Sequence, residues 1–174
     1  ETRESVRNDL GIGENTLLLG HIGRFCEAKN HKFLLDIFSS IRERQPDSRL
    51  ILVGEGPLCE ETKQYAQKIG VSDYVLFLGS SKTPEKYYNA MDVFVLPSIF
   101  EGFPVVAVEA QANGLYCFFS TEVTKEAKLL DTTMYIPLSD GKEKWADAIM
   151  NTNLKCNREN GYHVLSESRY SISK

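Results

Sequence analysis

The sequence lacks the features that mark metal-binding, disulfide-rich or membrane-spanning proteins. It has only four cysteines and three histidines in 174 residues, and no CxxC pair, so neither a zinc site nor a disulfide framework is indicated. No apolar run approaches the ~20 residues of a spanning helix, and the opening ETRESVRNDLG is no signal peptide. We therefore expect a cytoplasmic protein in which Cys59 and Cys117 are buried as small apolar side chains.

An excess of positive charge is also missing. The formal net charge is -4 and the sequence pI is near 5.5, which argues against a protein that binds nucleic acid through general attraction to phosphate. The hydrophobic fraction of 42% in 174 residues suits one well-buried domain, which we take to span residues 1–174. The first residues resemble the end of a helix closed by Gly11, as expected of a fragment of a longer protein.

Apolar segments alternate with amphipathic ones along the chain. Strands are predicted at 16–23, 49–54, 74–79, 92–98, 115–120 and 134–138. Helices are predicted at 30–45, 57–70, 83–91, 104–113 and 142–152, with Asn30 and Thr83 as N-caps and a polar helical tail running to 174. The 104–113 segment has valines that favour a strand, but its flanking Pro104 and Asn113-Gly114 favour a helix. The alternation predicts an α/β fold with a doubly wound, Rossmann-like parallel sheet of about six strands.

Three loops that follow predicted strands carry chemically distinctive residues. Arg24 and Lys29 follow the first strand, the glycines of GEGPL follow the second, and SIFEGFP follows the fourth. Because the carboxyl ends of parallel strands share one edge of a sheet, these loops are expected to meet there. GEGPL is neither GxGxxG nor a Walker sequence, and it is equally typical of a tight turn. Two cations in one such loop suit a diphosphate.

Two glutamates stand in apolar surroundings, where isolated carboxylates are rare. Glu109 lies five residues beyond Pro104, or about 7.5 Å along a helix. We expect that from there it would reach past a phosphate bound at the helix start to the paired hydroxyls of a ribose. Glu101, in the preceding turn, then faces the group attached to the far phosphate. The alternative, that Glu109 points to solvent and Glu101 is an ordinary loop acid, is as well supported by the spacing alone.

The combination of GRF-x3-K, VGEGPL, FLG and EGFPVVAVEA resembles the C-terminal donor-binding domain of the family 4 retaining glycosyltransferases, which have the GT-B fold. Four sequence segments are similar to those of bacterial capsular and exopolysaccharide glycosyltransferases: KNH, LILVGEGPL, YYNAMDVFVLPSIFEGFP and VEAQANG. The resemblance covers residues 15 to 150. It implies a nucleotide-diphospho-sugar donor, transfer with retention to an acceptor hydroxyl on a glycan or a lipid-linked sugar, and a place in the cytoplasm or at the inner face of the membrane.

The resemblance also implies roles for single residues. The first glutamate of E-x7-E, Glu101, would lie by the donor sugar and be needed for transfer, and the second, Glu109, would bind the ribose. Arg24 and Lys29 would hold the diphosphate. The remaining implied positions are the backbone at Gly102, Phe103 and Val105 for the phosphates and sugar, and Ser81 for the base. No DxD sequence occurs, so protein cations are expected to stabilise the leaving group without a metal or other cofactor.

Other functions remain open at this stage. The N-terminal domain that binds most of the acceptor in this family is absent, so the chain is expected to bind a nucleotide sugar but not to turn over alone. A non-catalytic nucleotide or nucleotide-sugar binding module is the main alternative. Phosphorolysis or epimerisation on the same fold is a third reading, and a flavodoxin-like oxidoreductase fits worst. The 157–174 tail is expected to pack on the missing domain, as in relatives.

Overall fold

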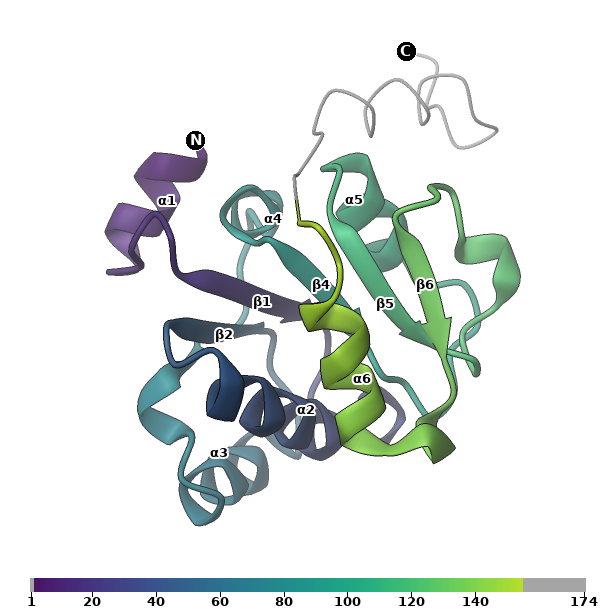
Figure 1. The fold of residues 1–174 in the computed structure, drawn as a ribbon, viewed down its shortest axis with the longest axis horizontal. Coiled ribbons are helices and arrows are strands. Elements are labelled where there is room, and N and C mark those ends of the chain that lie inside the picture. Colours follow the sequence, from purple (N-terminus) through teal and green to yellow (C-terminus); the bar gives the residue numbers. More distant parts are fainter. Residues whose placement is uncertain (1, 155–174) are drawn as a thin grey trace.

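A computed structural model describes residues 2–154, which form a parallel sheet with helices on both faces (Figure 1). The strands are β1 (Leu17–Ile22), β2 (Ser48–Val53), β3 (Val75–Phe77), β4 (Val93–Leu96), β5 (Tyr116–Ser120) and β6 (Thr133–Ile136). The α-helices are α1 (Arg3–Asp9), α2 (His31–Arg44), α3 (Cys59–Lys68), α4 (Glu85–Ala90), α5 (Val105–Ala112) and α6 (Gly141–Met150). The predicted doubly wound α/β fold is confirmed.

The strand order reverses in the middle of the sheet. The six strands lie in the order β3-β2-β1-β4-β5-β6, and all neighbouring pairs are parallel. The chain therefore winds outward from β1 to β3, then crosses back to place β4 on the other side of β1. At such a reversal the loops after the two central strands diverge, and ligands bind between them. The loops after β1 and β4 are thus the ones that the fold places at a ligand edge.

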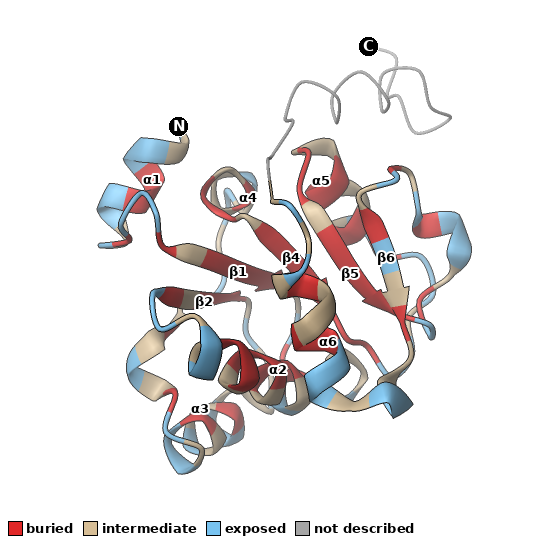
Figure 2. Cartoon of the chain, in the orientation of Figure 1, coloured by how far each residue is buried: buried red, intermediate tan, exposed pale blue. Residues whose placement is uncertain are grey.

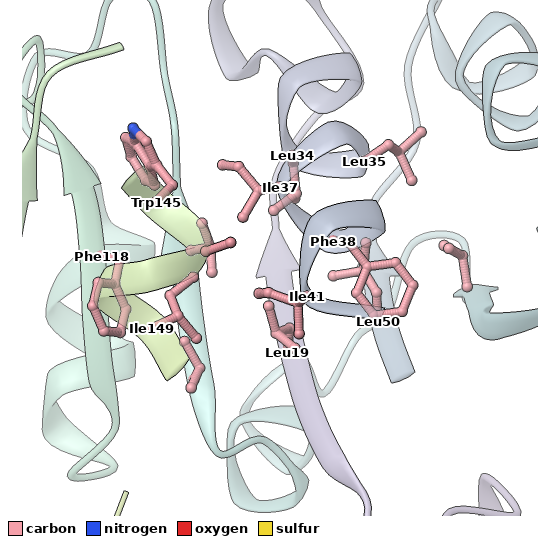
Figure 3. Packing of buried hydrophobic residues seen from close by; sticks show 14 of the residues in the cluster. Leu19, Leu34, Leu35, Ile37, Phe38, Ile41, Leu50, Phe118, Trp145 and Ile149 are labelled. Carbon is pink, nitrogen blue, oxygen red and sulfur yellow. The ribbon is translucent and has the colours of Figure 1, made fainter. Parts of the chain in front are cut away.

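One face of the sheet is covered by α2, α3 and α6. Apolar side chains of α2 and α6 pack over strand residues such as Leu19 and Phe118 (Figure 3). Trp145 is fully buried on this face, and its indole N–H donates to the Pro137 carbonyl at 3.1 Å. The strands β1, β4 and β5 are almost wholly buried (Figure 2), as expected for the centre of a sheet with helices on both faces.

The opposite face is covered by α1, α4 and α5, which enclose a second apolar cluster. Arg7 of α1 is buried and donates to the carbonyl oxygens of Ala90 at 2.9 Å and Gly13 at 2.6 Å. Burial lowers the pKa of this guanidinium, which nevertheless remains charged beside Asp92. Gly11, with φ 65°, ends the helix as its sequence predicts.

Some local predictions were wrong. Thr83 does not cap α4, because the N-cap position is held by Pro84 and no side chain bonds there. Asn30 holds the N-cap position of α2, but its side chain donates to the Pro97 carbonyl at 3.1 Å instead of capping the helix. Cys117 is buried as predicted, whereas Cys59 is only half-buried. The predicted helical tail and its packing at 157–174 lie outside the described residues.

Candidate functional site

Backbone hydrogen bonds tie the loops at the carboxyl edge of the sheet into one surface. The Phe25 N–H, after β1, donates to the Glu55 carbonyl at 3.0 Å, after β2. The Ile99 N–H, after β4, donates to the Ala28 carbonyl at 2.8 Å. The loop after β1 is therefore held from both sides, which fixes the positions of the side chains that it carries.

The glycines of GEGPL serve this loop packing. A Cβ atom at Gly54 would lie 2.1 Å from the Gly23 carbonyl oxygen, and one at Gly56 would lie 2.4 Å from the Phe25 carbonyl oxygen. Gly54 also has φ 140°, which other residues rarely adopt. These contacts are between protein backbones, so they explain the glycines without a phosphate. The interpretation of GEGPL as a tight turn is the one that the geometry favours.

An ion pair between the loops after β1 and β4 joins two of the predicted site residues. The Lys29 ammonium group, in the 3-10 turn Glu27–Lys29, contacts the Glu101 carboxylate, and their side chains are only 15% and 17% exposed. The same carboxylate oxygen accepts from the hydroxyl of buried Ser98 at 3.3 Å. A partly desolvated, hydrogen-bonded ion pair is stronger than a surface pair. The structure thus brings residues 72 positions apart into direct contact.

The start of α5 lies shortly after Glu101. Pro104 occupies its N-cap position and supplies no side-chain acceptor for the first backbone N–H groups of the helix, and such groups at a helix start attract anions. Gly102, Phe103 and Val105 are exposed. A Cβ atom at Gly102 would meet nothing within 4 Å, so glycine here leaves the approach to the helix start open.

Glu109 lies further along α5 and is held by a buried tyrosine. The Tyr88 hydroxyl, from α4, donates to Glu109 Oε2 at 2.9 Å. Burial, together with the nearby Glu109 charge, raises the pKa of Tyr88, so its phenol keeps its proton and remains a donor. Glu109 is half-buried. This bond fixes one carboxylate oxygen of Glu109, Oε2, at its position along α5.

The two remaining predicted residues make weaker connections. Arg24 is exposed in the loop after β1 and makes no ion pair within the described part of the chain. The Ser81 hydroxyl accepts from the Thr83 N–H at 3.1 Å, which is a local turn contact before α4. The structure therefore shows a structural task for Ser81, and the predicted contact with a base stays a prediction.

Several residues at this edge were missed by reasoning from sequence. Ser98, Tyr88 and Glu55 lie within quoted motifs but were given no role of their own. The Glu55 carboxylate accepts from the Ser80 hydroxyl at 3.1 Å. The contacts of Ser98 and Tyr88 depend on which strands are neighbours, so no local pattern signals them. Ile99 and Phe100 are 52% and 75% exposed beside Glu101 and form a small apolar patch. The sequence motif that contains them does not indicate that these side chains are exposed.

The described residues offer neither a metal cluster nor a membrane-spanning helix. No three His, Cys, Asp or Glu side chains in residues 2–154 gather in a way that would hold a metal ion. Over the same range, no helix has the length and apolar character needed to cross a membrane.

A doubly wound sheet with cationic and acidic side chains beside a helix start at its reversal point is an arrangement common among nucleotide-binding proteins. Comparison with known protein families identifies the family to which the chain belongs. The family model described as "Glycosyl transferases group 1" matches residues 2–130. The chain belongs to this family of glycosyltransferases.

Relatives with curated names are considerably longer than this chain. A Bacillus subtilis protein named as a glycosyltransferase, EpsF, is 41% identical over 140 residues, which are 80% of this chain and 36% of that protein. An Escherichia coli enzyme named UDP-Gal:alpha-D-GlcNAc-diphosphoundecaprenol alpha-1,3-galactosyltransferase is 34% identical over 114 residues, or 64% of this chain and 30% of that enzyme. The chain thus spans about a third of the length of these relatives.

Solved structures share the fold, which is that of GT-B glycosyltransferases. WaaG, a glycosyltransferase of lipopolysaccharide biosynthesis, matches 97% of this chain and 48% of its own with a TM-score of 0.85 and 21% identity. Anabaena Alr3699/HepE with UDP and glucose matches 94% of this chain and 47% of its own with a TM-score of 0.79 and 22% identity. The C-terminal domain of the group 1 protein LpcC from Francisella tularensis matches 99% of this chain and 95% of its own with a TM-score of 0.77 and 22% identity.

Proposed function

We propose that this chain is the donor-binding domain of a family 4 retaining glycosyltransferase, which binds a nucleotide-diphospho-sugar and passes the sugar to an acceptor hydroxyl during polysaccharide synthesis. The observation that carries the proposal is the Lys29–Glu101 ion pair beside the bare start of α5, at the reversal point of the sheet. A cation and a helix start suit a diphosphate, and a carboxylate next to them suits the hydroxyls of the attached sugar.

The proposed phosphate site is built from charge and backbone. Arg24 and Lys29 would meet the diphosphate oxygens from the β1 loop, and the backbone from Gly102 to Val105, through Phe103, would meet them from α5. Breaking the bond between sugar and phosphate leaves negative charge on the nucleoside diphosphate. These groups would stabilise that charge more in the transition state than in the bound donor. No metal or other cofactor has a role in this proposal.

The two glutamates would divide the remaining donor between them. Glu109, held by Tyr88 through one oxygen, has its other oxygen to accept from the ribose hydroxyls. Glu101 would accept from hydroxyls of the sugar, once Lys29 has turned toward the diphosphate. Ser81, in the loop after β3, would lie near the base. HepE binds UDP and glucose on the same fold, and this supports a nucleotide sugar as the ligand here.

A second domain would complete the enzyme. The chain spans 36% and 30% of the two relatives described above, and we propose that the missing part is an N-terminal domain that binds the acceptor. Exposed Ile99 and Phe100 lie beside Glu101, where that domain or the acceptor would cover them. The name of the Escherichia coli relative contains a lipid-linked sugar acceptor. We propose the same acceptor class here, on the cytoplasmic side of the membrane, and expect the isolated chain to bind its donor without transferring it.

Calorimetric titration of UDP, GDP and ADP into the chain, with and without EDTA, tests the proposal. We expect one nucleotide to bind and EDTA to leave its affinity unchanged. Glu109→Gln should weaken binding about tenfold, the effect of losing ~1.4 kcal/mol. Glu60→Gln is the matched control, because Glu60 is 73% exposed on α3, and it should bind as the unmodified chain does. Binding of no nucleotide, or equal weakening by both variants, would refute the proposed site.

A further inference from the structure

The floor of the site contains a buried histidine with one nitrogen that has no partner. His21 lies in β1 and is fully buried. Its Nδ1 lies 2.8 Å from the Val95 carbonyl oxygen. A carbonyl only accepts hydrogen bonds, so Nδ1 carries the proton and Nε2 presents a lone pair. Nε2 is buried without a hydrogen-bond partner, and leaving a buried acceptor unsatisfied typically costs about 1–3 kcal/mol.

The unpartnered nitrogen faces the part of the chain that carries Lys29. A Cβ atom placed on Gly23 would lie 3.0 Å from His21 Nε2 and 3.4 Å from Lys29 Cε. The imidazole and the lysine stem therefore flank the same small space, which glycine leaves empty. The ammonium group itself contacts Glu101, and rotation about the last bonds of the lysine side chain would turn it toward this space.

Neighbouring rings hold His21 in place and keep it neutral. His31 packs edge-on against His21 with ring centroids 4.8 Å apart, and it stacks on Phe25 at 4.1 Å. Burial, with a further contribution from the charge of Lys29, lowers the pKa of His21 to about 4. The ring is thus neutral at pH 7, and Nε2 is a hydrogen-bond acceptor at that pH.

We propose that His21 is a positioning residue for Lys29: its Nε2 accepts a hydrogen bond from the Lys29 ammonium group when a nucleoside diphosphate draws that group away from Glu101. An ammonium group has three donors. His21 takes one of them from below, the diphosphate takes another, and Glu101 is released to accept from the donor sugar. This inference rests on the proposed function of the Lys29–Glu101 pair.

A double-mutant cycle measured by UDP titration tests this role. His21→Asn keeps an N–H for the Val95 carbonyl and removes the Nε2 acceptor, while Lys29→Met removes the ammonium group. We expect His21→Asn to weaken UDP binding about tenfold in the unmodified chain and to have no further effect in the Lys29→Met chain. His21→Gln, whose amide oxygen reaches the Nε2 position, should recover part of the affinity.

The outcomes separate the inference from the function beneath it. Equal weakening by His21→Asn with and without Lys29 would show a structural role and overturn the inference. So would weakening by Lys29→Met with none from His21→Asn. Failure of the unmodified chain to bind UDP, GDP or ADP would overturn the proposed function as well.

If His21→Asn does not fold, nitrogen-15 NMR of the unmodified chain gives the answer. The Nε2 resonance should shift toward hydrogen-bonded values when UDP is added, and it should not do so in Lys29→Met. No shift on UDP saturation would overturn the inference.

Discussion

Replacing Tyr88 by phenylalanine isolates the hydrogen bond that orients Glu109. The substitution keeps the buried ring and its packing against Phe94, with centroids 5.8 Å apart, and removes only the hydroxyl that lies 2.9 Å from Glu109 Oε2. A hydrogen bond to a charged group contributes about 1.5–3 kcal/mol. Because Glu109 is half-buried, water replaces part of the lost bond, and we expect a loss of about 1 kcal/mol of stability.

The same change should weaken nucleotide binding. A freed Glu109 side chain must be ordered again when it meets the ribose, at a cost of about 0.5–1.5 kcal/mol. This corresponds to a loss of UDP affinity of about two- to twelvefold. A stability loss of 1 kcal/mol lowers Tm by about 2–4 °C in a domain of this size. Thermal melts and calorimetric titrations measure the two effects separately.

Tyr87→Phe is the matched control for this experiment. Tyr87 lies on the same helix, and no described residue bonds to its hydroxyl, so its loss should leave both Tm and UDP affinity unchanged. An unchanged Tm and affinity in Tyr88→Phe would refute the reasoning. A fall in Tm with unchanged UDP affinity would mean that the hydrogen bond stabilises the fold but that Glu109 does not contact the nucleotide.

Gly54→Ala should destabilise the chain by about 3 kcal/mol or more, because its Cβ would lie 2.1 Å from a backbone carbonyl oxygen. Gly70→Ala is the control: with φ 75° and open space around the Cβ, it should cost about 1 kcal/mol of stability. Urea unfolding measures both losses, and equal losses would contradict the packing argument. Burial lowers the pKa of His21 to about 4 and of His31 to about 2, so below pH 6.5 the unfolded chain binds more protons. The free energy of unfolding should then fall as pH drops from 6.5 toward 4, by up to about 1.4 kcal/mol per pH unit for each ring. In His31→Phe the free energy of unfolding should depend less steeply on pH. An equally steep dependence in that variant would contradict the burial of His31 in its neutral form. Glu101→Gln should leave UDP affinity within about threefold but abolish any gain in affinity from an attached glucose, and a retained preference for UDP-glucose over UDP would argue against Glu101 as the sugar contact.

The sheet was predictable because its signals are local. Apolar runs bounded by glycine and proline mark each strand, and the periodic apolar positions of 30–45 mark α2. The 104–113 segment was the hardest, since its valines favour a strand. This segment is a helix because Pro104 marks its start and Gly114 lies just beyond its end. Ala107 and Ala110 are buried on one side of it. The helix ends were less predictable: Thr83 was displaced by Pro84.

The candidate site was predictable only in part. Lys29 and Glu101 were expected at one edge because parallel strands end together, and the structure places them in contact. Their mutual ion pair was not foreseen, because sequence spacing gives an edge and not a distance. Tyr88 and His21 were missed for the same reason. The apolar segments around Tyr88 and His21 indicate that both side chains are buried, as they are, but they do not indicate the partners of their polar atoms.

A crystal structure of the chain with UDP, grown in EDTA, tests the central claim most directly. The account predicts the diphosphate between the Arg24–Lys29 loop and the start of α5, the ribose hydroxyls on Glu109, and Lys29 turned away from Glu101. UDP bound elsewhere on the chain, or bound only after a divalent metal is restored, would contradict it.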